Sequence, residues 1–144
     1  MDWLKLLIDY GITGLLVMMS VIAVGIALER RRFYMDVDLA RYTDRRELEF
    51  ELTRKLHVIA TIGSNAPYIG LLGTVLGIMF TFNSLGREGM MNSCMIMVGL
   101  ALTLKVTAAG LVVAIPSVTM YNFLLRRVRE LTMRWETGHG REKL

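Results

Sequence analysis

The chain has 144 residues, 53% of them hydrophobic, a mean hydropathy of +0.45 and a formal net charge of +4. This composition is too apolar for an ordinary water-soluble domain of that length. Three uncharged stretches account for it: residues 10–28, residues 58–86 and residues 90–125, the last interrupted by Lys105. Each meets the requirement of about 20 apolar residues for a membrane-spanning helix. The single cysteine, Cys94, excludes an internal disulfide.

The first predicted element is a spanning helix within residues 1–28. Its uncharged part resembles the apolar core of a signal peptide. However, Lys5 is balanced by Asp2 and Asp9, and no small-residue cleavage site precedes the charged cluster at 29–32. We therefore expect a helix that is retained in the mature protein.

Residues 29–57 are the second predicted element, a charged segment. Apolar residues recur in it at near-helical spacing, which favours a helix that continues into the second spanning helix; they are Leu39, Tyr42, Leu48, Leu52 and Leu56. Basic residues concentrate here and after residue 125, whereas the connection at 86–92 carries Arg87 alone. The positive-inside rule therefore predicts a cytoplasmic 29–57 segment and C terminus, with the N terminus outside. Basic clusters beside spanning helices more often contact anionic lipid than nucleic acid, so we expect lipid partners and no nucleic acid.

The second spanning helix, 58–86, and the third, 93–125, each carry a stripe of small residues. In both, the spacings alternate between four and three, so each stripe follows one helix face. The stripes consist of Gly63, Pro67, Gly70, Thr74, Gly77, Thr81 and Ser84 in the second helix, and of Gly99, Thr103, Thr107, Gly110, Ala114 and Ser117 in the third. Small faces let helix backbones approach closely in lipid. We therefore expect helix packing at Gly63, Gly70, Gly77 and Gly110.

Polar and helix-breaking residues within these stripes have two interpretations. Pro67 and Pro116 each remove an amide donor and free a carbonyl four residues earlier, which predicts kinks inside a buried bundle. Thr74 and Thr107 can bond the carbonyl one turn back, the common arrangement in membrane helices. They can instead line a narrow polar track. Periodicity alone favours the first interpretation and leaves the second open.

Lys105 is the one charge inside the third stretch. At about 100° per residue, it lies about 160° from Thr107, on nearly the opposite helix face. At about 1.5 Å per residue from Ser93, it lies about 18 Å from the outer end, past the midpoint of a core about 30 Å thick. Such a lysine either snorkels to the surface or marks an ion path or a buried pairing. The uncharged stretches contain no Asp or Glu, so any partner must be water, a hydroxyl, a carbonyl or another protein.

The remaining segments connect and extend these helices. The short turn at 87–92 makes the second and third spanning helices an antiparallel hairpin on the outside. The uncharged run before residue 126 is longer than a bilayer requires, so we expect residues 126–144 to form a cytoplasmic helix with a tail that frays from about Gly138. Helices two and three would then share a cytoplasmic extension.

The sequence lacks the residues that several classes of protein require. The sequence contains no cysteine–histidine pair in one region, no cluster of metal ligands and no phosphate-binding loop. His57 and His139 fall at a membrane edge and in the tail. We therefore expect no enzyme, no metal and no cofactor.

Two motifs resemble a known membrane family. Residues 60–79, ATIGSNAPYIGLLGTVLGIM, are similar to the second-span signature of the ExbB/TolQ proteins. Residues 107–111, TAAGL, followed by Ala114-Ile115-Pro116 and Tyr121-Asn122, are similar to their third-span signature. MotA-type flagellar stators are more distant relatives. The resemblance is close over about half the chain, and the layout of three helices fits the rest.

The resemblance implies an all-α membrane protein of the bacterial inner membrane. It implies a ring of subunits, generally a pentamer, around an ExbD-like single-span partner. Such complexes use the proton-motive force and act through TonB to open outer-membrane transporters. The functional threonines of the family match Thr74 and Thr107, which shifts our interpretation of both toward a polar role, with Lys105 biasing charge in the ring. A TolQ-like stator acting in envelope integrity and a non-coupling scaffold are the alternatives.

The sequence departs from the family pattern at one position. The family usually has a glutamate five residues before the Thr107 position, and Leu102 stands there. Lys105 follows one turn later. Because the spanning stretches lack acids, the resemblance implies that the intramembrane aspartate of the partner carries the proton.

Overall fold

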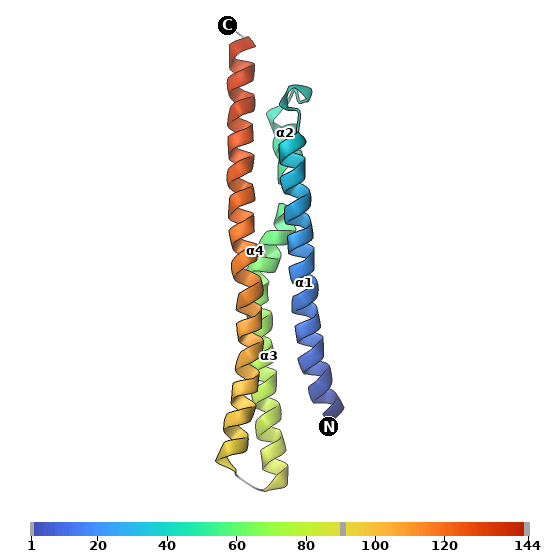
Figure 1. Cartoon of the computed structure of the whole chain (residues 1–144), viewed down its shortest axis with the longest axis vertical. Coiled ribbons are helices and arrows are strands. Elements are labelled where there is room, and N and C mark those ends of the chain that lie inside the picture. Colours follow the sequence, from blue (N-terminus) through green and yellow to red (C-terminus); the bar gives the residue numbers. More distant parts are fainter. Residues whose placement is uncertain (1, 90–91, 143–144) are drawn as a thin grey trace.

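The computed structural model describes residues 2–89 and 92–142, all of which belong to helices or the short segments between them (Figure 1). It confirms an all-helical protein with three helices long and apolar enough to cross a membrane. These are α1 (Asp2–Asp36), α3 (Leu56–Glu88) and α4 (Ser93–Glu142). A 3-10 turn, η1 (Leu39–Arg41), and a short helix, α2 (Arg45–Thr53), connect α1 to α3.

The hairpin of α3 and α4 is held by a close approach of the two backbones. A methyl group added at Gly70 would lie 3.1 Å from the Thr107 Cα and 3.2 Å from the Gly110 Cα. One added at Gly110 would lie 2.6 Å from the Ala66 carbonyl oxygen. Side chains larger than hydrogen would hold the helices apart at this level, so the glycines fix both their separation and their axial register.

A second core lies at the charged end of the molecule, between α1, α2 and α4 (Figure 1). Leu48 and Leu52 of α2 are completely buried there, against Tyr34 of α1 and Leu131 of α4. The Trp135 indole donates a hydrogen bond to the Tyr42 carbonyl at 3.0 Å. The apolar spacing that the sequence shows in this segment therefore buries α2 on the long helix α4.

The 29–57 segment is not one helix continuing into the second spanning helix, and that prediction is wrong. α1 runs on to Asp36, and new helical turns then begin at Asp38 and Asp44, whose carboxylates cap them by accepting from the amides of Ala40 and Arg46. α2 ends before α3 because Lys55 adopts a left-handed conformation, with φ of 66°. Short polar residues that bond their own backbone thus interrupt the helix pattern.

The break at Lys55 is bridged to α1 by three polar contacts. The Lys55 ammonium pairs with the Glu29 carboxylate at 3.0 Å, and the Arg30 guanidinium donates to the Glu51 carbonyl at 3.0 Å. The buried Tyr34 hydroxyl donates to the Leu52 carbonyl. These contacts tie the end of α2 to α1 while the chain reverses.

The extension beyond the uncharged stretches differs from the predicted one. It is built from the end of α1, from α2 and from α4, whereas α3 begins at Leu56 and contributes little to it. α4 also continues through Gly138 to Glu142 without fraying, with the His139 ring stacked on Trp135. Residues 90–91 of the predicted 87–92 turn, and residues 143–144 of the tail, lie outside the described residues.

The three long helices do not end at the same level where the α3–α4 hairpin turns. The N terminus of α1 lies beside the hairpin rather than at its tip (Figure 1). Gly73 of α3 marks this level, since a methyl group there would lie 2.5 Å from Val106 and 3.2 Å from Ile12. From Val106, α4 continues outward to Ser93, a further distance of about 20 Å. From Ile12, α1 extends about 15 Å in the same direction to Asp2, so it ends about one helical turn before α4 does.

Candidate functional site: a threonine cluster between α3 and α4

Two threonine hydroxyls meet at the contact between α3 and α4. The hydroxyls of Thr74 and Thr107 are within hydrogen-bonding distance of each other. The Thr74 hydroxyl also lies 3.0 Å from the Thr103 carbonyl oxygen and 3.4 Å from the Gly70 carbonyl oxygen. The Thr107 hydroxyl donates across the interface to the Gly70 carbonyl at 3.3 Å. Thr74 is buried, so these are contacts inside the protein and not with solvent.

Glycine packing makes this cluster possible. Gly70 lies against Thr107 and Gly110, and Gly77 lies against the Thr103 side chain, so both helix axes stay close on either side of Thr74. At that separation a threonine hydroxyl on one helix reaches a backbone carbonyl on the other.

The intrahelical bond expected of a membrane threonine is present for Thr74, whereas Thr107 bonds across the interface. Thr74 keeps an intrahelical contact to Gly70, one turn back, and adds the contacts to Thr103 and Thr107 on α4. The cluster contains two hydroxyl groups, which contact each other and the carbonyl oxygens of Gly70 and Thr103. Such a pair, each member able to donate or accept, can reorient its hydrogen bonds and solvate a passing proton or water.

Sequence reasoning assigned no site role to Thr103, which the structure brings into the cluster. Its hydroxyl donates back to the Leu100 carbonyl at 2.7 Å, while its own carbonyl accepts from Thr74. The small-residue stripe contained Thr103. Nothing in the sequence indicated that Thr103 faces Thr74, because the sequence of one helix does not determine its axial offset from another helix.

Lys105 is not part of this cluster. Its side chain is exposed on the outer side of α4, and within the described residues it makes no ion pair. Measured along α4 it is about 18 Å from Ser93. Measured against α1, however, its neighbour Val106 is level with Ile12, near the outer start of the 10–28 stretch. Lys105 therefore lies at the level of the first residues of the uncharged 10–28 stretch of α1.

The other predicted residues are distributed along the same interface or outside it. Leu102 is 47% exposed and lines a pocket beside Thr103. Gly63 lies against Val118. Pro67 and Pro116 each lie within a helix that continues past them.

The backbone near Pro67 receives local side-chain hydrogen bonds. Ser64 and Asn65 both donate to the carbonyl of Thr61, at 3.1 Å and 3.0 Å. The carbonyl that Pro67 frees belongs to Gly63. These side chains therefore bond the Thr61 carbonyl and not the freed carbonyl of Gly63.

Comparison with known proteins identifies the family of this chain. The model of the MotA/TolQ/ExbB proton channel family matches residues 28–137, which include α2, α3 and most of α4. The chain belongs to this family. The family resemblance read from the two spanning motifs is thereby confirmed. Membership makes the chain a multi-pass membrane protein of a transport-associated, non-enzymatic family.

Within the MotA/TolQ/ExbB family, the full-length similarity is to short ExbB proteins. The chain is 52% identical over 140 residues to the biopolymer transport protein ExbB of Aquifex aeolicus, covering 97% of this chain and 95% of that relative. It is 50% identical over 136 residues to the putative biopolymer transport protein ExbB-like 2 of Helicobacter pylori, covering 94% and 91%. The chain is 46% identical to the longer ExbB of Pseudomonas putida over 71 residues, which cover 49% of this chain and 22% of that relative.

Proposed function

We propose that this chain is an inner-membrane stator subunit that, with an ExbD-like single-span partner, uses the proton-motive force to energise TonB-dependent uptake across the outer membrane. The observation that carries the proposal is the partly buried contact between Thr74 and Thr107, in a chain similar to ExbB over nearly its whole length. In this proposal, the N terminus is periplasmic, and the 29–57 and 126–144 segments are cytoplasmic.

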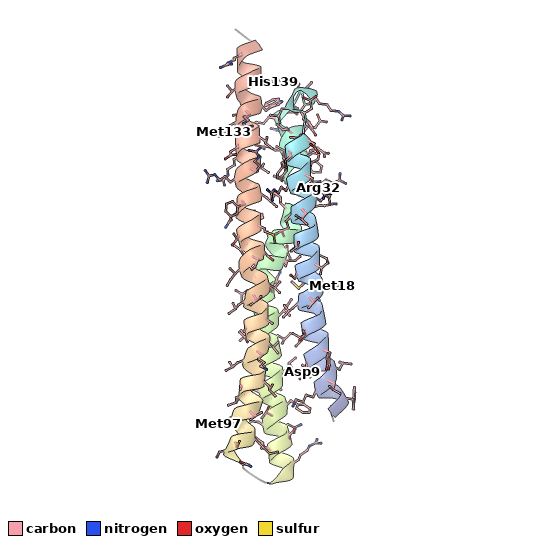
Figure 2. The ribbon with its side chains drawn as sticks, viewed as in Figure 1. Asp9, Met18, Arg32, Met97, Met133 and His139 are labelled. Atoms are coloured by element: carbon pink, nitrogen blue, oxygen red, sulfur yellow. The ribbon has the colours of Figure 1, made fainter. Side chains whose placement is uncertain are left out.

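The outer surface of the helices supports assembly into a ring, for which we propose a pentamer. Large apolar side chains project from α4 on the side away from its neighbours, as Met97 and Met133 do in Figure 2. Val112 is 70% exposed and Ile115 is 65% exposed. Lipid or further copies of the chain must cover this surface. Lys105 lies on the same side of α4, so a ring would present its charge to a neighbouring copy or to a central partner.

The proposed mechanism assigns different tasks to the partner and to this chain. An intramembrane carboxylate of the partner takes up the proton, and while ionised it is attracted to Lys105. Protonation removes that attraction and permits a rotational step. Moving one charge through 100 mV supplies about 2.3 kcal/mol, so a few protons drive a sizeable rearrangement. The hydroxyls of Thr74 and Thr107 solvate the proton path.

Removing the hydroxyls tests the role of the cluster. We expect Thr74→Val and Thr107→Val to assemble with the partner and to lose iron–siderophore or cobalamin uptake. Thr61→Val and Thr119→Val are matched controls, since both threonines are exposed and bond the carbonyl four residues back on the same helices. If all four variants support normal uptake, the cluster serves packing alone.

The identity of the partner separates the proposal from its alternatives. Co-purification with an ExbD-like chain supports coupling to uptake, whereas a TolR-like chain indicates a stator acting in envelope integrity. A complex that conducts no protons in liposomes, with or without the partner, indicates a scaffold.

A further inference from the structure

A groove runs between α1 and α4 where their uncharged stretches end. Its volume is about 540 Å³, within the range of about 300–1,000 Å³ of sites that hold small molecules. Its apolar lining includes Ala27 and Leu28 of α1, and Met120, Phe123 and Leu124 of α4. α1 and α4 run in the same direction toward the basic end of the molecule (Figure 1), so both walls change from apolar to charged in the same order.

The charged end of the groove carries one arginine from each wall. Arg31 comes three residues after the uncharged 10–28 stretch, and Arg127 comes two residues after the 90–125 stretch. Both arginines are therefore at the depth where lipid phosphates lie, while the apolar lining is at the depth of the acyl chains. This order of apolar and basic residues matches the order of the groups in one phospholipid molecule.

The two arginines keep a net positive charge at this end of the groove. Arg31 is exposed and makes no ion pair within residues 2–89 and 92–142. Arg127 contacts Glu130 at 3.1 Å, but the same carboxylate also lies 3.6 Å from Arg126, so these three groups together keep one positive charge. No acidic side chain among the described residues lines the groove. Its charge therefore favours an anionic ligand.

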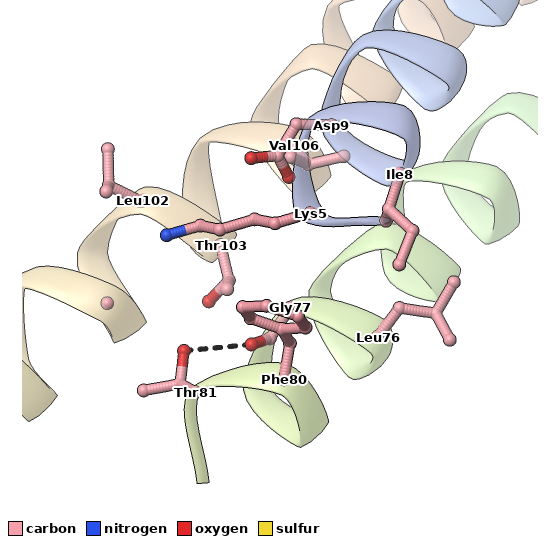
Figure 3. A pocket seen from close by; sticks show the side chains of 11 residues that line it. Lys5, Ile8, Asp9, Leu76, Gly77, Phe80, Thr81, Leu102, Thr103 and Val106 are labelled. Atoms are coloured by element: carbon pink, nitrogen blue, oxygen red, sulfur yellow. Dashed lines mark hydrogen bonds between the residues drawn. The ribbon is translucent and has the colours of Figure 1, made fainter. Parts of the chain in front are cut away.

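The pocket beside the threonine cluster differs in this respect (Figure 3). Its volume is about 110 Å³, and Lys5 and Asp9, both from α1, supply charges of opposite sign to its lining. Figure 3 shows the Lys5 side chain extended toward Leu102 of α4. Opposite charges one helical turn apart offset each other. This pocket therefore has no excess of positive charge for an anionic headgroup, whereas the groove at the basic end has one.

A phospholipid fits the groove better than a second copy of the chain does. Leu28 and Phe123 are exposed, so lipid tails or another protein must cover the apolar wall. The acids nearest to the two arginines along α1 and α4 are Glu29 and Glu130, and both are already paired within the protomer. A second copy therefore brings the arginines no free acid from these helices at this level, whereas a phospholipid phosphate supplies a negative charge.

We propose that the groove binds one anionic phospholipid, with its phosphate between the Arg31 and Arg127 guanidinium groups and an acyl chain along the apolar wall. Guanidinium groups bind phosphate oxygens through paired N–H donors. Basic pockets between spanning helices bind anionic headgroups in this way. The bound lipid contacts α1 and α4 together and so holds their basic ends at a fixed spacing. The site requires only that both helices span a bilayer, so it is independent of the proposed proton-driven function.

Native mass spectrometry of the purified, assembled protein counts the lipid molecules that it retains from mixed micelles. We expect phosphatidylglycerol to bind about tenfold more tightly than phosphatidylcholine with the same acyl chains. Arg31→Gln and Arg127→Gln should each weaken the binding of phosphatidylglycerol about fivefold, and the double variant should bind both lipids equally. Equal binding of the two lipids by the unaltered protein overturns the proposal.

Arg32→Gln and Arg126→Gln are the matched controls. Each removes an exposed arginine next to a lining arginine, and neither side chain lines the groove. We expect both variants to keep the preference for phosphatidylglycerol. A loss as large as that in Arg31→Gln and Arg127→Gln indicates a diffuse attraction to the basic surface and overturns the site. Displacement of phosphatidylglycerol by inorganic phosphate at the same concentration also overturns it, because the acyl chain would then contribute nothing to binding.

Photolabelling locates the lipid in the assembled protein. Phosphatidylglycerol with a photoreactive diazirine in its acyl chain is incorporated into liposomes, and peptide mass spectrometry locates the adducts. We expect residues 120–124 to be labelled severalfold more than residues 95–98, an exposed apolar segment at the other end of α4. The double variant Arg31→Gln, Arg127→Gln should remove that difference. Absence of labelling at 120–124 indicates that another copy of the chain covers the groove, and this result overturns the proposal.

Discussion

Gly110 is the position at which the packing of α3 on α4 is most sensitive to a single methyl group. In Gly110→Ala, the added carbon would lie 2.6 Å from the Ala66 carbonyl oxygen and 3.0 Å from the Gly70 Cα. Favourable contacts between such atoms lie at about 3.5–4.0 Å, so the helices must separate by about 1 Å. Both neighbours are backbone atoms, which cannot rotate away as a side chain can.

That separation also breaks the threonine cluster. The Thr74 hydroxyl lies 3.0 Å from the Thr103 carbonyl, and the Thr107 hydroxyl lies 3.3 Å from the Gly70 carbonyl. A shift of about 1 Å takes both beyond hydrogen-bonding range. Overpacking costs about 1–3 kcal/mol, and interhelical hydrogen bonds in membranes contribute about 0.6 kcal/mol each. We therefore expect Gly110→Ala to lower the free energy of unfolding by about 2–4 kcal/mol.

The assay is equilibrium unfolding of the purified protein in detergent, by titration with sodium dodecyl sulfate and helicity as the signal. Gly25→Ala is the matched control, because no atom lies within 4 Å of the added methyl group. Because alanine favours a helix more than glycine does, we expect Gly25→Ala to leave the free energy of unfolding unchanged or to raise it slightly. The reasoning is refuted if Gly110→Ala has the same free energy of unfolding as Gly25→Ala and also supports normal uptake. Neither the close approach of the helices nor the threonine cluster would then have the importance assigned to it.

Four further predictions concern the bridge at the helix break and the isolated lysine. Lys55→Val should destabilise the protein by about 1–3 kcal/mol because a β-branched residue is strained at positive φ, whereas Lys55→Gly should not, as thermal unfolding will show. Glu29→Gln should change the unfolding temperature little, since the ion pair with Lys55 is solvent-exposed, and a large loss would refute the dominance of backbone strain at this break. Tyr34→Phe should cost about 1–3 kcal/mol and speed amide exchange in α2, because the buried carbonyl of Leu52 loses its donor; unchanged exchange would contradict this. Lys105→Met should assemble and lose energised uptake while Lys105→Arg retains it, and normal uptake by the methionine variant would remove Lys105 from the mechanism.

Part of the candidate site was predictable because helix periodicity is local. The spacing of Gly70, Thr74 and Gly77 puts them on one face whatever the helix packs against. The same reasoning put Lys105 on a different face of its helix from Thr107. It failed in the 29–57 segment, where the side chains of Asp38 and Asp44 cap new helical turns and override an apolar spacing that suited a continuous helix.

The depth of Lys105 shows a second limit. Counting residues from Ser93 placed it past the midpoint of a bilayer. In the structure Val106 lies level with Ile12, near the start of the uncharged 10–28 stretch, so the two helices give different estimates of the same depth. Hydropathy measures each helix separately and contains no information about how far one slides along another.

The sequence by itself determined three spanning helices, the sign of the charge at their ends, the small-residue stripes and, through its two motifs, the family. The tertiary structure decided the axial register, and with it that Thr74 reaches the Thr103 carbonyl and that Lys5 and Asp9 reach the outer half of the hairpin. The physical reason is that a helix bonds its own backbone residue by residue, so its faces follow from composition along the chain. Register depends on which glycine lies against which backbone, as Gly110 lies against Ala66, and that contact joins residues far apart in sequence.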